Sequence, residues 1–102
     1  VVEVLDLSVE RKLGARNQGI LEWTVRFRNR SQSYAGGRIA IFFIDSYQSI
    51  LASDECPFSF LEPSEQESCN GETTVPIEIA NGVRKVSAEI RLAKPNKDRT
   101  QR

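Results

Sequence analysis

The chain has 102 residues, 39% of them hydrophobic and 27% charged, which is enough for one folded domain and too few for two. Fourteen basic and fourteen acidic side chains give a net charge of zero, which excludes the strongly basic surface of a general nucleic-acid-binding protein. The sequence contains no histidine, so the commonest general base and the commonest metal ligand are both absent from it. We therefore expect a domain that is not an enzyme and that uses no metal or cofactor.

The first third of the chain predicts two strands joined by a hairpin. Residues 2–10 alternate imperfectly between apolar and polar, and a slip near Leu5 predicts a β-bulge on an edge strand. Two glycines and an asparagine in residues 12–19 predict the hairpin loop. Residues 20–29 alternate strictly, which predicts a half-buried strand with Trp23 in the core.

The middle of the chain predicts a central strand followed by shorter elements. After a connector at residues 30–37, residues 38–45 are apolar on both faces, as expected of a central strand. A turn at residues 46–49 precedes a short strand at residues 50–52. We expect the aromatic residues of segment 58–65 to plug one end of the core.

The last part of the chain predicts an edge strand, a turn and a final strand. Residues 73–79 alternate but contain Pro76, which favours a place at a sheet edge. Asn81 and Gly82 form the strongest short turn signal before the strand predicted at residues 85–92. About seven short strands and no helix of ten residues are typical of an all-β sandwich in a single domain, residues 1–93, with a flexible polar tail at 94–102.

Two cysteines, Cys56 and Cys69, enclose a polar stretch that is expected to be a loop. A disulfide between them would close a loop of about fourteen residues and stabilise the fold by about 3 kcal/mol. It would also favour an oxidising compartment. The alternative is two reduced cysteines, one of them packed in the core as a small hydrophobic residue.

Three segments resemble the FxLYD family of bacterial envelope domains: Trp-Thr-Val-Arg-Phe-Arg-Asn-Arg-Ser at 23–31, Ile-Phe-Phe-Ile-Asp at 41–45 and Leu-Glu-Pro-Ser-Glu at 61–65. The resemblance implies an immunoglobulin-like β-sandwich and an extracytoplasmic location, whether periplasmic, lipoprotein-anchored or secreted. Four residues match the family pattern, whereas Ile41, Phe43, Ile44 and Ser64 replace its Phe, Leu, Tyr and Gly. The matching residues are Asp45, Leu61, Pro63 and Glu65.

Short polar side chains in these segments have local structural roles. Asn29, Ser31 and Asp45 are expected to cap turns through bonds to nearby backbone groups. Asn29-Arg30-Ser31 also satisfies the rule for an N-glycosylation acceptor, but such a short match is common by chance.

Four arginines form a candidate docking face. Arg26 and Arg28 are two residues apart on one strand and so share a face of the sheet, and we expect Arg30 and Arg38 to extend this basic stripe. One interpretation is protection of the sheet against aggregation. The other is a docking surface for an acidic protein partner, an anionic polymer or lipid headgroups, which arginine suits because its planar fork binds carboxylate or phosphate.

Other candidate ligand groups are few. Tyr34 and Tyr47 are the loop aromatics that could contact a carbohydrate, beside Phe58 and Phe60. An acidic stretch near the cysteines could hold a calcium ion, but its spacing matches no known loop and a solvated acidic loop is favoured. Its members are Asp54, Glu55, Glu62, Glu65, Glu67 and Glu72. The leading hypothesis is a module that binds a protein partner through loops or an exposed strand edge, and the alternative is a module for carbohydrate or another anionic polymer.

Overall fold

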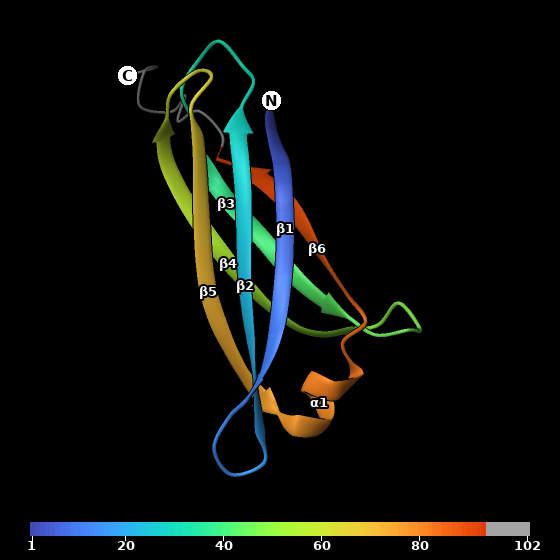
Figure 1. Cartoon of the computed structure of the whole chain (residues 1–102). Helices are drawn as coiled ribbons and strands as arrows, with labels where there is room; N and C mark the ends of the chain where they lie inside the picture. The colour runs from blue at the N-terminus through green and yellow to red at the C-terminus, as the bar shows by residue number, and fades with distance from the viewer. Residues whose placement is uncertain (94–102) are drawn as a thin grey trace, which may run out of the picture.

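The computed structural model of the chain describes residues 1–93 and consists almost entirely of antiparallel strands (Figure 1). The predicted tail at 94–102 lies outside the described residues. The strands are β1 (Val2–Leu13), β2 (Gln18–Asn29), β3 (Ala35–Ile44), β4 (Ile50–Leu61), β5 (Gln66–Pro76) and β6 (Lys85–Leu92), and the short helix α1 (Ile77–Gly82) precedes β6.

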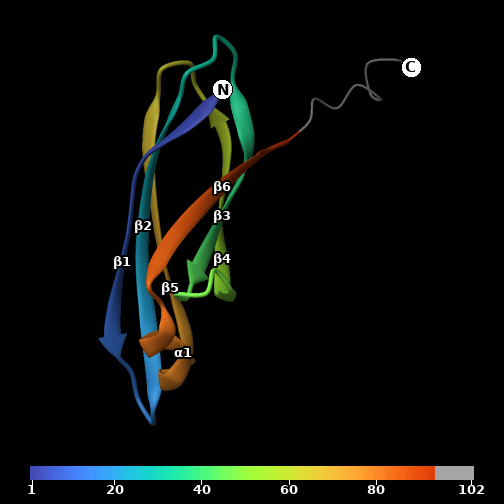
Figure 2. The same ribbon diagram turned by 90° about the vertical axis from the view of Figure 1, so that its right-hand side faces the viewer.

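The strands form two three-stranded antiparallel sheets. Sheet A has the order β1-β2-β5 and sheet B the order β4-β3-β6, so β2 and β3 are the central strands. The two sheets face each other as two layers, with β6 running diagonally across one side (Figure 2). The prediction of an all-β fold is confirmed, and residues 38–45 do supply a central strand.

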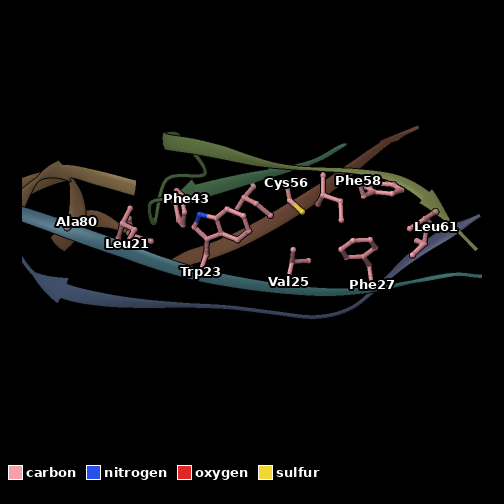
Figure 3. Close-up of a cluster of buried hydrophobic side chains, with 13 residues drawn as sticks. Leu21, Trp23, Val25, Phe27, Phe43, Cys56, Phe58, Leu61 and Ala80 are labelled. Atoms are coloured by element: carbon pink, nitrogen blue, oxygen red, sulfur yellow. The ribbon is translucent and has the colours of Figure 1, made fainter. Parts of the chain in front are cut away.

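The core lies between the two sheets because β2 and β3 each direct every second side chain inward. Leu21, Trp23, Val25 and Phe27 are buried on β2 and lie between the two ribbons (Figure 3). Trp23 is therefore the core residue that the alternation predicts. Side chains from β3 and β4 complete the cluster, namely Ile39, Ile41, Phe43, Cys56, Phe58 and Leu61.

The predicted irregularity near Leu5 is confirmed. The register between β1 and β2 shifts between Val4 and Asp6, so the buried row of β1 changes from even to odd residue numbers. The predicted hairpin is also present, and its turn at residues 14–17 places Arg16 and Asn17 at positive φ, 53° and 61°.

Three predictions, about the number of strands and about the second half of the chain, are wrong. Within residues 1–93 there are six strands rather than about seven, and segments 50–52 and 58–61 belong to one strand, β4. The stretch between the cysteines is not a loop. It comprises the last residues of β4, a turn at residues 62–65 and the first residues of β5. Residues 77–79 belong to α1 instead of an edge strand, although β5 itself is an edge strand.

The Cys56–Cys69 disulfide joins β4 to β5 across the two sheets, with 6.4 Å between the Cα atoms. The disulfide links the two sheets next to the core. Cys69 is the register partner of Val25, and Cys56 belongs to the same buried cluster as Phe58. Residues 1–93 contain no helix of the length and apolar character that a membrane span requires.

Candidate functional site

The four arginines predicted as one docking face lie on two different sheets. Arg26 and Arg28 are on the outer face of β2, whereas Arg38 is on β3 in sheet B. Arg26 stands opposite Asp6, and Arg30 Nε donates to Glu3 Oε1 at 2.6 Å. The structure therefore breaks up the expected basic stripe and places mixed charges along sheet A.

The two candidate tyrosines lie beyond opposite ends of β3 and cannot contact one small ligand together. Tyr34 precedes the first residue of β3 and is 63% exposed, while Tyr47 is in the turn after β3 and is 86% exposed. In that turn Asp45 Oδ1 accepts hydrogen bonds from the backbone N–H groups of Tyr47 and Ser49, both at 2.8 Å. The predicted capping role of Asp45 is thus confirmed.

The acidic stretch near the cysteines does not form a cation site. The carboxylate of Asp54 points between the sheets, where it accepts bonds from Trp23 Nε1 and Thr73 Oγ1, both at 2.9 Å. Glu65 Oε1 accepts from Glu62 N at 2.8 Å and closes the turn between β4 and β5. Within the described part of the chain no three acidic or thiol side chains gather in a way that could hold a metal ion.

A lysine and a glutamate form an ion pair on the outer face of sheet A. Lys12 Nζ lies 2.9 Å from Glu22 Oε1 on the outer face near the hairpin. The hydrogen bond from Lys12 lowers the pKa of Glu22, and the same bond raises the pKa of Lys12. The surrounding row is acidic, because Glu22 faces Glu10 on β1 and Glu72 on β5.

Asn29 holds together the end of the molecule where β2, β3 and β4 meet. Its side chain is fully buried, and Nδ2 donates to Ser33 O at 2.8 Å and to Leu61 O at 2.9 Å. Its Oδ1 accepts from Ser31 N at 2.9 Å and Ser31 Oγ at 2.7 Å. The predicted turn cap is confirmed, and the folded chain has no accessible amide at this acceptor motif.

Near this end of the molecule sheet B contains two adjacent glycines, and we name the surface around them the Gly36–Gly37 platform. Gly36 and Gly37 open β3, and a Cβ at Gly37 would collide with the Arg91 carbonyl and lie 2.8 Å from Leu92 Cα. Two shallow hollows of about 410 and 260 Å³ adjoin the platform and share Leu92 and Ala93. Arg38, Arg91, Pro57 and Glu55 line the first hollow, and Tyr34 lines the second.

Phe60 lies beside this platform in an unusual backbone conformation. Its φ is +53° and its side chain is 81% exposed. β4 has one residue more than β3 here, since Leu61 pairs with Ala35 and Phe58 with Gly37, so Leu61 turns inward and Phe60 outward. The prediction that Phe60 plugs the core is therefore wrong, although Phe58 and Leu61 are buried.

Two arginines stand side by side at the edge of the platform. Arg38 and Arg91 are register partners on β3 and β6. Directly opposed like charges destabilise a sheet, and here acidic neighbours offset them. Arg38 Nε lies 3.9 Å from Glu55 Oε2, and Arg91 Nη2 donates to Glu89 Oε1 at 2.7 Å.

Sequence reasoning missed Arg91 and the exposure of Phe60 as features of this site. The sequence signals were the adjacent glycines near the start of β3 and the arginine in the last strand. Neither signal predicts a site until β3 and β6 are known to pair. No protein-family model matches the chain, and a search of the curated proteins finds no similar sequence.

Proposed function

We propose that the chain is a non-enzymatic interaction module of a bacterial envelope or secreted protein, and that it binds a protein partner through the Gly36–Gly37 platform. Phe60 carries this proposal. A bulky residue at positive φ is strained, by about 1–3 kcal/mol, and glycine would relieve the strain at this bulge. Neither the strained φ nor the exposed apolar ring stabilises the isolated fold, and a partner contact would give both a role.

The strand order supports an immunoglobulin-like topology as part of the proposal. If β1, β2 and β5 are strands A, B and E, then β4, β3 and β6 correspond to C′, C and F. In this scheme strand G, which would pair with β6, has no counterpart among residues 1–93.

The turn between β4 and β5 supports the resemblance to the FxLYD family. Glu65 N donates to Glu62 O at 2.9 Å, and Ser64 has φ +68° at the position where the family has glycine. Pro63 precedes it, as a type II turn prefers.

The extracytoplasmic part of the proposal rests on the Cys56–Cys69 bridge. Acid quenching of native cells followed by thiol alkylation and intact mass measurement tests it. Two alkylated thiols would contradict that location.

Site-specific photo-crosslinking tests the platform. A benzoylphenylalanine at position 60, introduced in the native host, should trap a partner that the same probe at Leu13 does not trap. Leu13 is an apt control because it is 83% exposed at the opposite end of the molecule. The variant Phe60→Gly should be at least as stable as the wild type and should lose the partner, and retention of the same partner would refute the proposal.

A second candidate is binding of an acidic carbohydrate or another anionic polymer. The observation that favours it is that Tyr34 lines one of two adjoining hollows and Arg38 and Arg91 line the other, since an aromatic ring stacks on sugars and arginine binds carboxylates. Titration of the protein with a polyuronate, compared between wild type, Tyr34→Ala and Tyr47→Ala, separates this candidate from the first. The Tyr47 variant is the control, because that ring lies beyond the far end of β3.

A further inference from the structure

Among residues 1–93, β6 is the edge strand that contains neither a bulge nor a proline to hinder pairing. Among residues 1–93 no strand pairs with its far edge, which faces the viewer in Figure 2. The other edges carry devices that hinder pairing: β1 is bulged after Val4, β4 contains Pro57, and β5 ends at Pro76. β6 contains no proline, and its pairing with β3 is regular along its whole length.

The backbone groups at this edge are directed outward in a known order. Ala93 N donates to Gly36 O at 2.7 Å, so residues 36 and 93 form a hydrogen-bonded pair. Because such pairs alternate along an antiparallel ladder, the N–H and C=O groups of Ala88, Ile90 and Leu92 point away from β3. Ala88 and Ile90 are half-buried and Leu92 is 48% exposed, so the edge also presents an incompletely covered apolar row.

We propose that two copies of this chain associate through β6, pairing antiparallel about a two-fold axis at Ile90 and joining their B sheets into one. In this register Ile90 faces itself, Ala88 faces Leu92 of the second copy, and Glu89 faces Arg91 of the second copy. The symmetry makes each of the last two contacts twice. The proposal goes beyond the platform function and does not depend on it.

The charges of β6 select this register. A two-fold axis at Ala88 would place Lys85 against Arg91, and an axis at Glu89 or Arg91 would place that residue against itself. An axis at Ser87 would pair Lys85 with Glu89 but would leave Leu92 uncovered. Only the axis at Ile90 combines opposite charges on the outer face with burial of Leu92 on the inner face.

The ion pair required by this interface is already formed within each copy. Arg91 Nε and Nη2 donate to Glu89 Oε1 at 3.0 and 2.7 Å, and both side chains are about half exposed. Association exchanges these bonds for equivalent bonds between copies, so the two charged groups remain paired.

Variants with reversed charges test the proposal. The mass of the full chain is measured by analytical ultracentrifugation over a series of concentrations. The wild type should dimerise, whereas Glu89→Arg and Arg91→Glu should each be monomeric, because each variant creates two like-charged contacts across the axis. Mixing the two variants in equal amounts should restore a mixed dimer, because both contacts are then between opposite charges. The double variant E89R/R91E should dimerise with itself for the same reason.

The control variant is Lys85→Glu, which should dimerise like the wild type because no residue among 1–93 of the second copy lies opposite Lys85 in this register. All three positions are exposed, and circular dichroism checks that each variant is folded. Hydrogen exchange should slow at the amides of Ala88, Ile90 and Leu92 as the wild type associates. A monomer at every concentration, a dimer insensitive to both single variants, a dimer dissociated by Lys85→Glu, or association without protection of these amides would overturn the proposal.

Discussion

Replacing Asn29 by aspartate tests whether the junction of β2, β3 and β4 depends on hydrogen bonds that a nearly isosteric side chain cannot make. The substitution removes both donors of Nδ2, so Leu61 O loses this hydrogen bond and Ser33 O keeps only the one from Ser31 Oγ. A buried acceptor left without its donor costs about 1–3 kcal/mol, so the loss at Leu61 O, with a smaller loss at the half-buried Ser33 O, should amount to about 2–3 kcal/mol. That is a large fraction of the 5–15 kcal/mol typical of a small domain.

The loss of unfolding free energy caused by Asn29→Asp should depend on pH. An aspartate at position 29 faces carbonyl oxygens, so its pKa in the folded state is raised above the unfolded value. The full deficit is therefore present above the folded-state pKa and narrows as the pH falls through it, because the protonated acid again donates one hydrogen bond.

Urea unfolding followed by the fluorescence of Trp23, the single tryptophan, measures both effects. Asn70→Asp is the matched control, because Asn70 is exposed on the outer face of β5 and its change should lie within about 0.5 kcal/mol. If Asn29→Asp and Asn70→Asp destabilise equally, or if the deficit of the first widens in acid, the assigned bonds do not hold this junction.

Three further predictions concern the disulfide, one turn and one ion pair. Reduction of Cys56–Cys69 should lower the free energy of unfolding by about 3 kcal/mol, and an unchanged urea midpoint after complete reduction would contradict this. Ser64→Gly should stabilise the fold by about 1 kcal/mol, because glycine accepts the φ of +68° that serine tolerates poorly, and a loss of stability would show that the serine side chain is needed. Because Lys12 lowers the pKa of Glu22, this pair stabilises the fold at neutral pH, and the contribution is lost as the pH falls below the ordinary pKa of glutamate and through the lowered value. Carboxyl titration by NMR should show the pKa of Glu22 rising towards its ordinary value in Lys12→Gln, and an unmoved titration curve would exclude the pair as the cause.

The central strands could be predicted from the sequence because burial imposes its own period on them. β2 is buried on one face, so its apolar residues recur at every second position, whereas on β3 the outer-face residues Ala40 and Phe42 are buried and half-buried as well, so its apolar run is nearly continuous. Even the bulge at Leu5 was visible, because the apolar residues of β1 change from even to odd positions where the register shifts.

The strands β4 and β5 could not be recognised in the same way. Both are edge strands with an exposed polar face, and residues 53–57 of β4 resemble a solvated loop because only Cys56 among them is fully buried. The helix α1 was missed for a different reason. Its six residues are too few to show a helical period, and its position depends on a distant contact, since Ala80 packs against Gly19 so closely that a Cβ there would collide with it.

The candidate site was hidden from the sequence because it is assembled by pairing between strands that are distant in the chain. Arg38 and Arg91 become neighbours only through the β3–β6 register. In the sequence Gly36 and Gly37 belong to a predicted connector. The structure shows that the Arg91 carbonyl lies too close to Gly37 for a side chain to fit there. Composition and periodicity describe residues that are close in the chain, so they cannot predict contacts between distant strands.

Five residues other than glycine have positive φ within the described chain, and they are not equivalent. Arg16, Asn17, Gln48 and Ser64 are polar and lie in turns, where a positive φ serves the reversal of the chain. Phe60 lies inside a strand, carries a large apolar ring and exposes most of it to solvent. The bulge needs an extra residue to bring Leu61 into the core, but it does not need that residue to be aromatic. The identity of Phe60 is therefore the feature of this chain that folding leaves unexplained, which is why we place the partner contact there.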